Sequence, residues 1–393
     1  MNTQNTPVHI RLWHHDFWRM SVANFLLAAS VYMLIPTLPL WMMSEGGYNS
    51  AEVAAAMGVF GIGLFLLGPF CSYLVQRYRR NVVCMLSVIA MVVLLAILYD
   101  ACSLSSVYAN GTALVIDRLL MGATFGLAQM TLASTLIIDT SESFQRTEAC
   151  HSSAWFSRFA LSLGPMTGLL ILHFWGFRQV VIASMACALV AVVLIRLVGF
   201  PFRTPEEDVP VVSLDRFFLP QGRVLFVSLM AITTVVGLLM SRPLSYVFYG
   251  QLMLGFLMAL IAQRFVFRDA ELKSEAVSGL LLIGATLLML LTRRELDIVF
   301  YAAPLMIGLG VGIIGARFLL FFIKLSHHCQ RGTSQSTYIL GWESGLSLGL
   351  AIGYGLMADD HDTALTVALV LTAMLLLLYV VYIHNWFVIN KNR

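Results

Sequence analysis

Long apolar runs separated by short polar breaks dominate this chain. Each run is about as long as the ~20 apolar residues that a helix needs to cross a bilayer. An isolated helix satisfies its own backbone hydrogen bonds in lipid, whereas an open sheet edge does not, so the runs predict an all-α membrane protein with twelve transmembrane helices. The runs lie at about 17–41, 51–75, 81–101, 112–138, 148–173, 179–200, 223–241, 244–264, 275–292, 297–325, 333–357 and 363–389.

One sizeable polar break divides these runs into six and six. It follows residue 200 and reads PFRTPEEDVPVVSLDRFFLPQGR, with four prolines and clustered charge. Such a composition is typical of a connecting segment rather than of a helix within lipid. We therefore expect an N-terminal six-helix bundle over residues 1–200, a cytoplasmic linker over 201–222 and a C-terminal six-helix bundle over 223–393.

The two halves share loop motifs at nearly equal offsets. One pair of motifs is separated by 187 positions and the other by 185. Since each half has an even number of runs, duplicated halves would be parallel repeats related by an axis along the membrane normal, with span 5 equivalent to span 11. The matched positions are Gly68 with Gly255, Gln76-Arg77-Tyr78 with Gln263-Arg264-Phe265, Gln145-Arg146-Thr147 with Gln330-Arg331-Gly332, and Gly164 with Gly349.

Composition and charge narrow the class of protein. Hydrophobic residues make up 59% of the chain and charged residues 11%, against about 25% charged in a soluble domain. With the N-terminus inside, sixteen Lys and Arg residues fall in cytoplasmic segments and four in outer loops. The positive-inside rule then places both termini in the cytoplasm, and we expect a multi-pass protein of the plasma (inner) membrane. A net charge of +3 does not indicate nucleic-acid binding, and no cysteine or histidine spacing predicts a metal or other cofactor.

Several short motifs lie in the same order and on the same spans as in one family of transporters. Span 1 ends in Pro36-Thr37-Leu38-Pro39, and span 4 carries an R-x-x-x-G motif from Arg118 to Gly122, followed by Asp139 and Arg146. Span 5 contains a G-P-x-x-G element from Gly164 to Gly168. Over almost its whole length the chain resembles the major facilitator superfamily, and within it the twelve-span drug:proton antiporter group. The resemblance implies alternating access around a site at mid-membrane.

The sequence departs from this family in the loop after span 2. That loop usually reads G-x-L-x-D-R-x-G-R, and here Ser72, Gln76 and Arg79 replace Gly, Asp and Gly. In the family the Asp helps to latch the cytoplasmic side, so we expect a weaker or differently made latch. Span 1 has no carboxylate, and Asn24 is its only strongly polar interior residue. The candidate gating residues are Gln76, Arg77, Asp139, Arg146, Arg264 and Arg331.

Charges inside the spans mark a candidate substrate and coupling site. Arg158 lies about ten residues into span 5 and Glu343 about ten into span 11, so both are near mid-depth and 185 positions apart. A buried charge in a membrane is costly, which means that it faces protein or water. Either the two residues line a central cavity, or they pair with neighbours and hold the bundles together. The candidate residues are Arg158, Glu343, Arg118, Arg317, Asn24, His151, Trp155, Trp342 and Tyr338.

Two of these assignments, Arg118 and Arg317, have structural alternatives. Arg118 either faces the cavity, as the family motif implies, or pairs with Asp117 or reaches the surface. Arg317 follows four glycines whose small size permits close helix packing, and it either lines the cavity or belongs to that packing. Gly164, Pro165 and Gly168 are expected to bend span 5 and let another helix approach.

The sequence favours a secondary transporter over other classes of membrane protein. It has no Walker A motif, no nucleophile or metal motif of an enzyme, and no repeated pore segments. Three arginines within spans against one mid-membrane carboxylate favour a small organic solute that is anionic or amphipathic. The antiporter-like motifs imply proton-coupled export, and we expect a monomer. The alternatives are an uptake symporter for a sugar or organic acid and a flippase for a lipid-like substrate.

Overall fold

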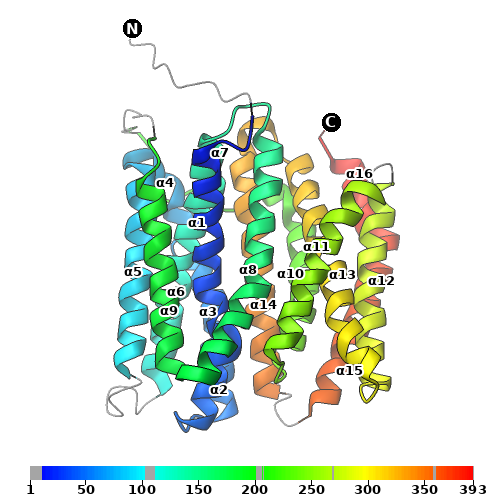
Figure 1. The fold of residues 1–393 in the computed structure, drawn as a ribbon. Coiled ribbons are helices and arrows are strands. Elements are labelled where there is room, and N and C mark those ends of the chain that lie inside the picture. The colour runs from blue at the N-terminus through cyan, green and yellow to red at the C-terminus, as the bar shows by residue number, and fades with distance from the viewer. Residues whose placement is uncertain are drawn as a thin grey trace.

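The computed structural model describes residues 11–101, 111–200, 206, 208–267, 270–356 and 360–392. Within these ranges every regular element is a helix. The start of the expected linker, residues 201–205 and 207, lies outside the described residues. Figure 1 shows the helices running side by side, with those of the first half grouped beside those of the second half.

The described part of the first half contains nine α-helices and two shorter irregular ones. They are α1 (His15–Tyr32), α2 (Leu34–Ser44), α3 (Ser50–Leu66), η1 (Gly68–Phe70), α4 (Cys71–Arg77), α5 (Arg80–Ala101), α6 (Gly111–Thr131), η2 (Leu132–Leu136), α7 (Ile137–Asp139), α8 (Arg146–Trp175) and α9 (Phe177–Arg196). The second half contains η3 (Pro220–Gly222), α10 (Arg223–Met240), α11 (Tyr246–Phe265), α12 (Leu272–Thr292), α13 (Asp297–Leu325), η4 (His328–Gln330), α14 (Arg331–Leu356), α15 (His361–Leu378), η5 (Tyr379–Ile383) and α16 (His384–Asn390).

Eleven helical segments in the described part of the chain are long and apolar enough to cross a membrane. Each corresponds to one of the apolar runs, and α1 and α2 together form the first. The 26-residue α14 is long enough but is not one of the eleven. It carries a run of buried polar residues at Thr333–Thr337 and a buried Glu343. The helical membrane fold is therefore confirmed, while a count of twelve spans stays a prediction.

The same helix pairs pack in both halves. In the first half α1 packs on α8 and α9, α3 on α6, and α5 on α6 and α9. In the second half α10 packs on α14 and α15, α11 on α13, and α12 on α13 and α15. The most extensive contacts between the halves are α3 with α14 and α8 with α11. This is the pattern that parallel repeats would produce, with α8 in the position of α14.

The first span is interrupted at Met33, between α1 and α2. Pro36 has no N–H to donate to the carbonyl of Tyr32, so a regular helix cannot continue through this point. The interruption lies against α8. A Cβ added to Gly164 would be 3.0 Å from the Cβ of Tyr32, and one added to Gly168 would be 2.7 Å from the carbonyl oxygen of Met33.

These two glycines thus allow the close helix approach that the sequence predicts. Pro165 lies inside α8, which runs as one helix from Arg146 to Trp175. A bend of α8 at this proline stays a prediction.

Both ends of the described chain lie at one end of the helices. Figure 1 shows α1 beginning and α16 ending at this end, which we call the terminal end. The opposite end is the one at which α2 finishes at Ser44. The positions of the cavities described below are given relative to these two ends.

Candidate functional site

A small cavity between the two halves brings together the mid-membrane charges. Arg158 on α8 and Glu343 on α14 are 2% and 5% exposed, and both line this cavity. Its volume is about 20 Å³, enough for about one water molecule. A solute therefore needs the surrounding side chains or helices to move before it can enter. Of the other predicted residues, Asn24, Tyr338 and Trp342 also line the cavity.

Arg158 and Glu343 do not bind each other, and each charge is linked to the opposite half through a tyrosine. Nη2 of Arg158, in the first half, donates to the hydroxyl of Tyr338 in the second half at 3.2 Å. The hydroxyl of Tyr32, in the first half, donates to Oε1 of Glu343 in the second half. Two reciprocal hydrogen bonds therefore close the interface between the halves at the level of the cavity.

The Arg158 guanidinium has unused hydrogen-bonding capacity. Its carbon lies 4.5 Å from the centre of the Trp155 ring, a cation–π contact. Its Nε and Nη1 atoms are buried and have no partner among the described residues. Buried donors of a charged group are normally satisfied, because leaving them unpaired costs free energy. An anion in the cavity would satisfy them.

Two side-chain amides in the cavity offer acceptors. Nδ2 of Asn24 donates to Ser157 Oγ at 2.9 Å and to the carbonyl oxygen of Ser153 at 3.1 Å. These two bonds fix the amide on α8, and Oδ1 of Asn24 is left without a partner in the described part of the chain. Oε1 of Gln335 on α14 is likewise unpartnered there. The lining thus presents unpartnered donors at Arg158 and unpartnered acceptors at Asn24 and Gln335 among the described residues.

The other residues predicted near this site lie beside the cavity or away from it. His151 contacts the Trp155 ring edge-on, with the ring centres 6.4 Å apart, and neither residue lines the cavity. Arg118 on α6 lies over the Phe60 ring at 4.7 Å. It forms no hydrogen bond with Asp117, whose two carboxylate oxygens have no partner among the described residues. Arg118 therefore makes its contacts inside the first half.

Arg317 also makes its main contact inside one half. Its guanidinium forms an ion pair with Glu275 on α12, and the Glu275 side chain is 1% exposed. Arg317 does not line the central cavity. Of the two alternatives drawn from the sequence, the structure favours a role in packing α13 against α12.

The predicted gating residues are divided between several contacts at the terminal end. Arg146 and Arg331 line one cavity of about 150 Å³ together with Asp139. Asp139 forms an ion pair with Arg80, which was not among the predicted residues. Nη1 of Arg331 donates across the halves to the carbonyl oxygen of Ser143 at 3.4 Å.

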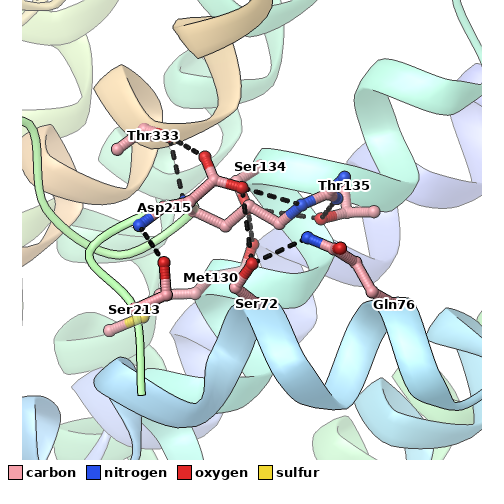
Figure 2. Close-up of polar contacts among 9 residues, drawn as sticks. Ser72, Gln76, Met130, Ser134, Thr135, Ser213, Asp215 and Thr333 are labelled. Carbon is pink, nitrogen blue, oxygen red and sulfur yellow. Dashed lines mark hydrogen bonds and ion pairs between the residues drawn. The ribbon is translucent and has the colours of Figure 1, made fainter. Parts of the chain in front are cut away.

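The remaining gating candidates lie apart from this cavity. Arg77 and Arg264 do not line it, and their gating role stays a prediction. Gln76 donates through Nε2 to Ser72 Oγ at 2.8 Å, within α4. Figure 2 shows that this pair lies next to Asp215, a residue of the linker.

Several residues at these sites, Arg80 among them, were not on the list of site candidates drawn from the sequence. Tyr32 and Gln335 could have been included, because Tyr32 precedes Pro36 by one turn and Gln335 lies two turns from Glu343 on α14. Gln129 also lines the central cavity, from α6. Asp215 belongs to an irregular segment, where no periodicity indicates which way a side chain points.

Comparisons with known proteins identify the fold and the family. A family model described as "Major Facilitator Superfamily" matches residues 20–350. The POT family transporter PepTSo has a TM-score of 0.72 at 12% identity, with 95% of this chain and 98% of that chain covered.

Two further solved structures show the same fold. The nucleoside transporter NupG has a TM-score of 0.66 at 10% identity, with 94% of this chain and 99% of that chain covered. The human organic anion transporter MFSD10 (TETRAN) has a TM-score of 0.66 at 14% identity, with 92% and 98% covered. No curated protein sequence matches the chain significantly. The chain is a transporter, not an enzyme, and it belongs to the major facilitator superfamily.

Proposed function

We propose that this chain is a secondary transporter that moves a small organic anion, or an amphipathic solute with an anionic group, by alternating access. The unpartnered Nε and Nη1 atoms of buried Arg158, in a cavity shared by both halves, carry the proposal. A guanidinium with two free donors matches a carboxylate or phosphate in charge and geometry. Asn24 and Gln335 would bind donors elsewhere on the same solute.

Alternating access agrees with the distribution of cavities along the interface. A cavity of about 390 Å³ lies at the end opposite the terminal end, between Pro36, Leu40 and Met43 of α2 and Arg242 and Tyr354 of the second half. It is much larger than the central cavity, and Tyr32 lies one turn from Pro36. We propose that a solute passes between these two cavities when the Tyr32–Glu343 and Arg158–Tyr338 hydrogen bonds separate.

The membrane and the orientation of the chain belong to the same proposal. We place the protein in the plasma (inner) membrane as a monomer of twelve spans, with the terminal end in the cytoplasm, because basic loops are retained there. Residues 1–200 and 223–393 would then move relative to each other, joined by the linker.

We propose that Glu343 carries the coupled proton. The geometry around it also supports a second candidate direction of transport, uptake rather than export. The G-P-x-x-G element in α8 is similar to that of antiporters and supports proton-coupled export. However, Glu343 and Arg158 line one cavity without pairing. An anion bound at Arg158 is repelled by a charged Glu343, so it binds best when Glu343 is neutral. Proton and anion would then move together, which supports an uptake symporter for an organic acid.

The experiment that tests this proposal is a thermal-shift screen of the purified protein at pH 6 and pH 8. Benzoate, octanoate and citrate serve as anions, and tetraethylammonium, glucose and a short-chain lipid as the other classes. We expect stabilisation by at least one anion and none by the cation, because the cavity presents an unpaired guanidinium. Stronger anion stabilisation at pH 6 than at pH 8 supports symport, and the reverse supports antiport. Stabilisation by the cation or the sugar alone would contradict the proposed substrate class.

The Gly315→Ala variant tests whether the position of Arg158 sets anion affinity. A Cβ at residue 315 of α13 would be 2.7 Å from Nε of Arg158 and 2.9 Å from the Trp342 ring. The methyl group must displace one of them, so we expect anion affinity to fall by about tenfold, roughly 1.4 kcal/mol. Isothermal titration with the best anion of the screen measures this change.

Gly250→Ala is the matched control for this variant. Residue 250 lies in α11, and a Cβ there meets only Met166 Sδ, at an ordinary 3.5 Å. Alanine favours the helical state over glycine by about 1 kcal/mol at both positions. A general effect on helix stability would therefore appear in both variants. Equal anion affinities in the two variants would show that the position of Arg158 does not set anion affinity.

A further inference from the structure

Two consecutive linker residues each bind both halves of the protein at the terminal end, and Figure 2 shows the first of them, Asp215, between Ser72 and Thr333. Oδ2 of Asp215 accepts from Ser72 Oγ of α4 at 3.4 Å, and Oδ1 accepts from Thr333 Oγ1 of α14 at 3.2 Å. Nη1 of Arg216 donates to Thr135 Oγ1 of η2 at 3.2 Å, and its backbone N–H donates to Thr333 Oγ1 at 3.0 Å. Each residue therefore connects the first half to the start of α14.

The linker on either side of this pair is tied to one half at a time. Before it, the backbone N–H of Ser213 donates to the carbonyl oxygen of Pro69 at 3.0 Å, in the first half. After it, the backbone N–H of Leu219 donates to Thr337 Oγ1 of α14 at 2.8 Å. The linker thus crosses from one half to the other at Asp215 and Arg216.

The backbone at Arg216 shows that this crossing is a specific conformation. Its φ of 57° is the only positive value at a non-glycine residue in the described part of the chain. A side chain in this left-handed region is unfavourable and persists only where surrounding contacts hold it. At Arg216 those contacts are the two bonds to Thr333 and Thr135, one to each half.

The charge of Asp215 also fits its position. Thr333 is the third residue of α14, so the carboxylate lies at the N-terminus of a 26-residue helix, where the helix dipole favours a negative charge. Helix α4 provides no carboxylate to the N-terminus of α14, because residue 76 is Gln and its amide binds Ser72. Asp215 is half-exposed, so each single contact is weak, and the connection depends on the set of contacts.

We propose that Asp215 and Arg216 form a latch that holds the two halves together at the terminal end. When that end opens, each residue must release either its first-half partner or Thr333, so the latch stabilises the closed arrangement. The linker is then a gating element rather than a passive tether. This inference rests on the proposed alternating access, but not on the proposed substrate or on proton coupling.

The latch is tested by measuring the distance between the halves at the terminal end. The exposed residues Tyr78 and Lys324 are replaced by Cys and spin-labelled, in a protein whose native cysteines are Ser, reconstituted in nanodiscs. Double electron–electron resonance then gives the fraction of molecules with this end open. We expect Asp215→Asn to raise that fraction at least threefold, because the neutral amide no longer benefits from the α14 dipole.

Two further variants make the result decisive. Thr333→Val removes the partner that Asp215 and Arg216 share and should raise the open fraction similarly, which keeps the test valid if Asp215→Asn does not fold. Asp208→Asn is the matched control, because Asp208 is an exposed acid of the same linker. Distance distributions of Asp215→Asn and Thr333→Val that equal those of the unsubstituted protein and of Asp208→Asn would overturn the latch.

The measurement uses neither solute nor proton gradient, so it separates the latch from the proposed substrate. An open fraction that rises in a protein without anion stabilisation would refute the substrate class alone. Anion stabilisation without any change in the open fraction would refute the latch alone.

Discussion

Replacing Arg158 with glutamine is expected to weaken binding of small organic anions at least ~30-fold. Losing a charge-assisted hydrogen bond in a buried site costs about 2 to 5 kcal/mol, and 2 kcal/mol corresponds to roughly a 30-fold change in affinity. Glutamine has no positive charge, and its side chain is too short to present the donors of a guanidinium at the same position. Titration calorimetry on the purified variant measures the change.

The same substitution should leave the fold intact. Arg158 makes one hydrogen bond in the described structure, and two of its donors are buried without partners. Removing an uncompensated buried charge relieves a desolvation cost, so we expect an unchanged or raised melting temperature. Stability lost together with binding would show that Arg158 is a structural residue.

Arg178→Gln is the matched control for this variant. Arg178 is exposed on α9, where its guanidinium lies 4.5 Å from the centre of the Tyr99 ring. The chemical change is identical but lies outside the cavity, so anion affinity should not change. A similar loss in both variants would mean that net charge, rather than the cavity, controls binding.

The apolar pattern predicted most of the fold because the helices must satisfy a single rule. A span needs about 20 apolar residues, and each run along the chain meets this length. The rule is weakest where a helix is buried by other helices rather than by lipid. α14 shows this, because it packs against α3 and α10 and carries Thr333–Thr337 as buried polar residues. The polar residues of α14 are therefore explained by its burial among other helices, and they do not indicate a loop.

The shared position of two residues along their helices could be predicted, but their bonding partners could not. Counting residues along a helix placed Arg158 and Glu343 at similar depth, and they do line one cavity. Their partners depend on how each helix is rotated and on which helices meet. Tyr32 reaches Glu343 because Gly164 lets α1 approach α8, a contact between segments far apart in sequence.

The same limit explains Arg317 and Asp215. Arg317 was identified as a charge within a span, but its ion pair with Glu275 of α12 depends on the rotation of α13. Asp215 lies in a segment without regular structure, where neither period nor depth applies. Gln76, in place of the usual carboxylate, led us to expect a latch of a different kind, but nothing in the sequence pointed to the linker segment that we propose for it.

Replacing Glu343 with glutamine is expected to reduce proton-driven accumulation of the transported anion at least tenfold, while the protein still binds the anion. Glutamine has nearly the same shape, and its amide oxygen can accept the hydrogen bond from the Tyr32 hydroxyl, so the interface between the halves should still close. It cannot bind or release a proton, so a pH gradient can no longer drive the cycle. Accumulation of the radiolabelled anion in proteoliposomes, with and without a pH gradient, measures this effect.

Binding by the same variant also distinguishes the two proposed directions. If a charged Glu343 repels the anion, Glu343→Gln should bind at pH 8 as tightly as the unsubstituted protein does at pH 6, and its affinity should no longer vary between these values. If proton and solute compete instead, the variant should bind weakly at both values, like the protonated protein. Glu148→Gln, an exposed acid in the first turn of α8, is the control and should accumulate the anion normally. Accumulation by Glu343→Gln that still follows the pH gradient would falsify a coupling role for Glu343. The proton would then have to be carried by another buried acid, such as Asp117, whose carboxylate has no partner among the described residues.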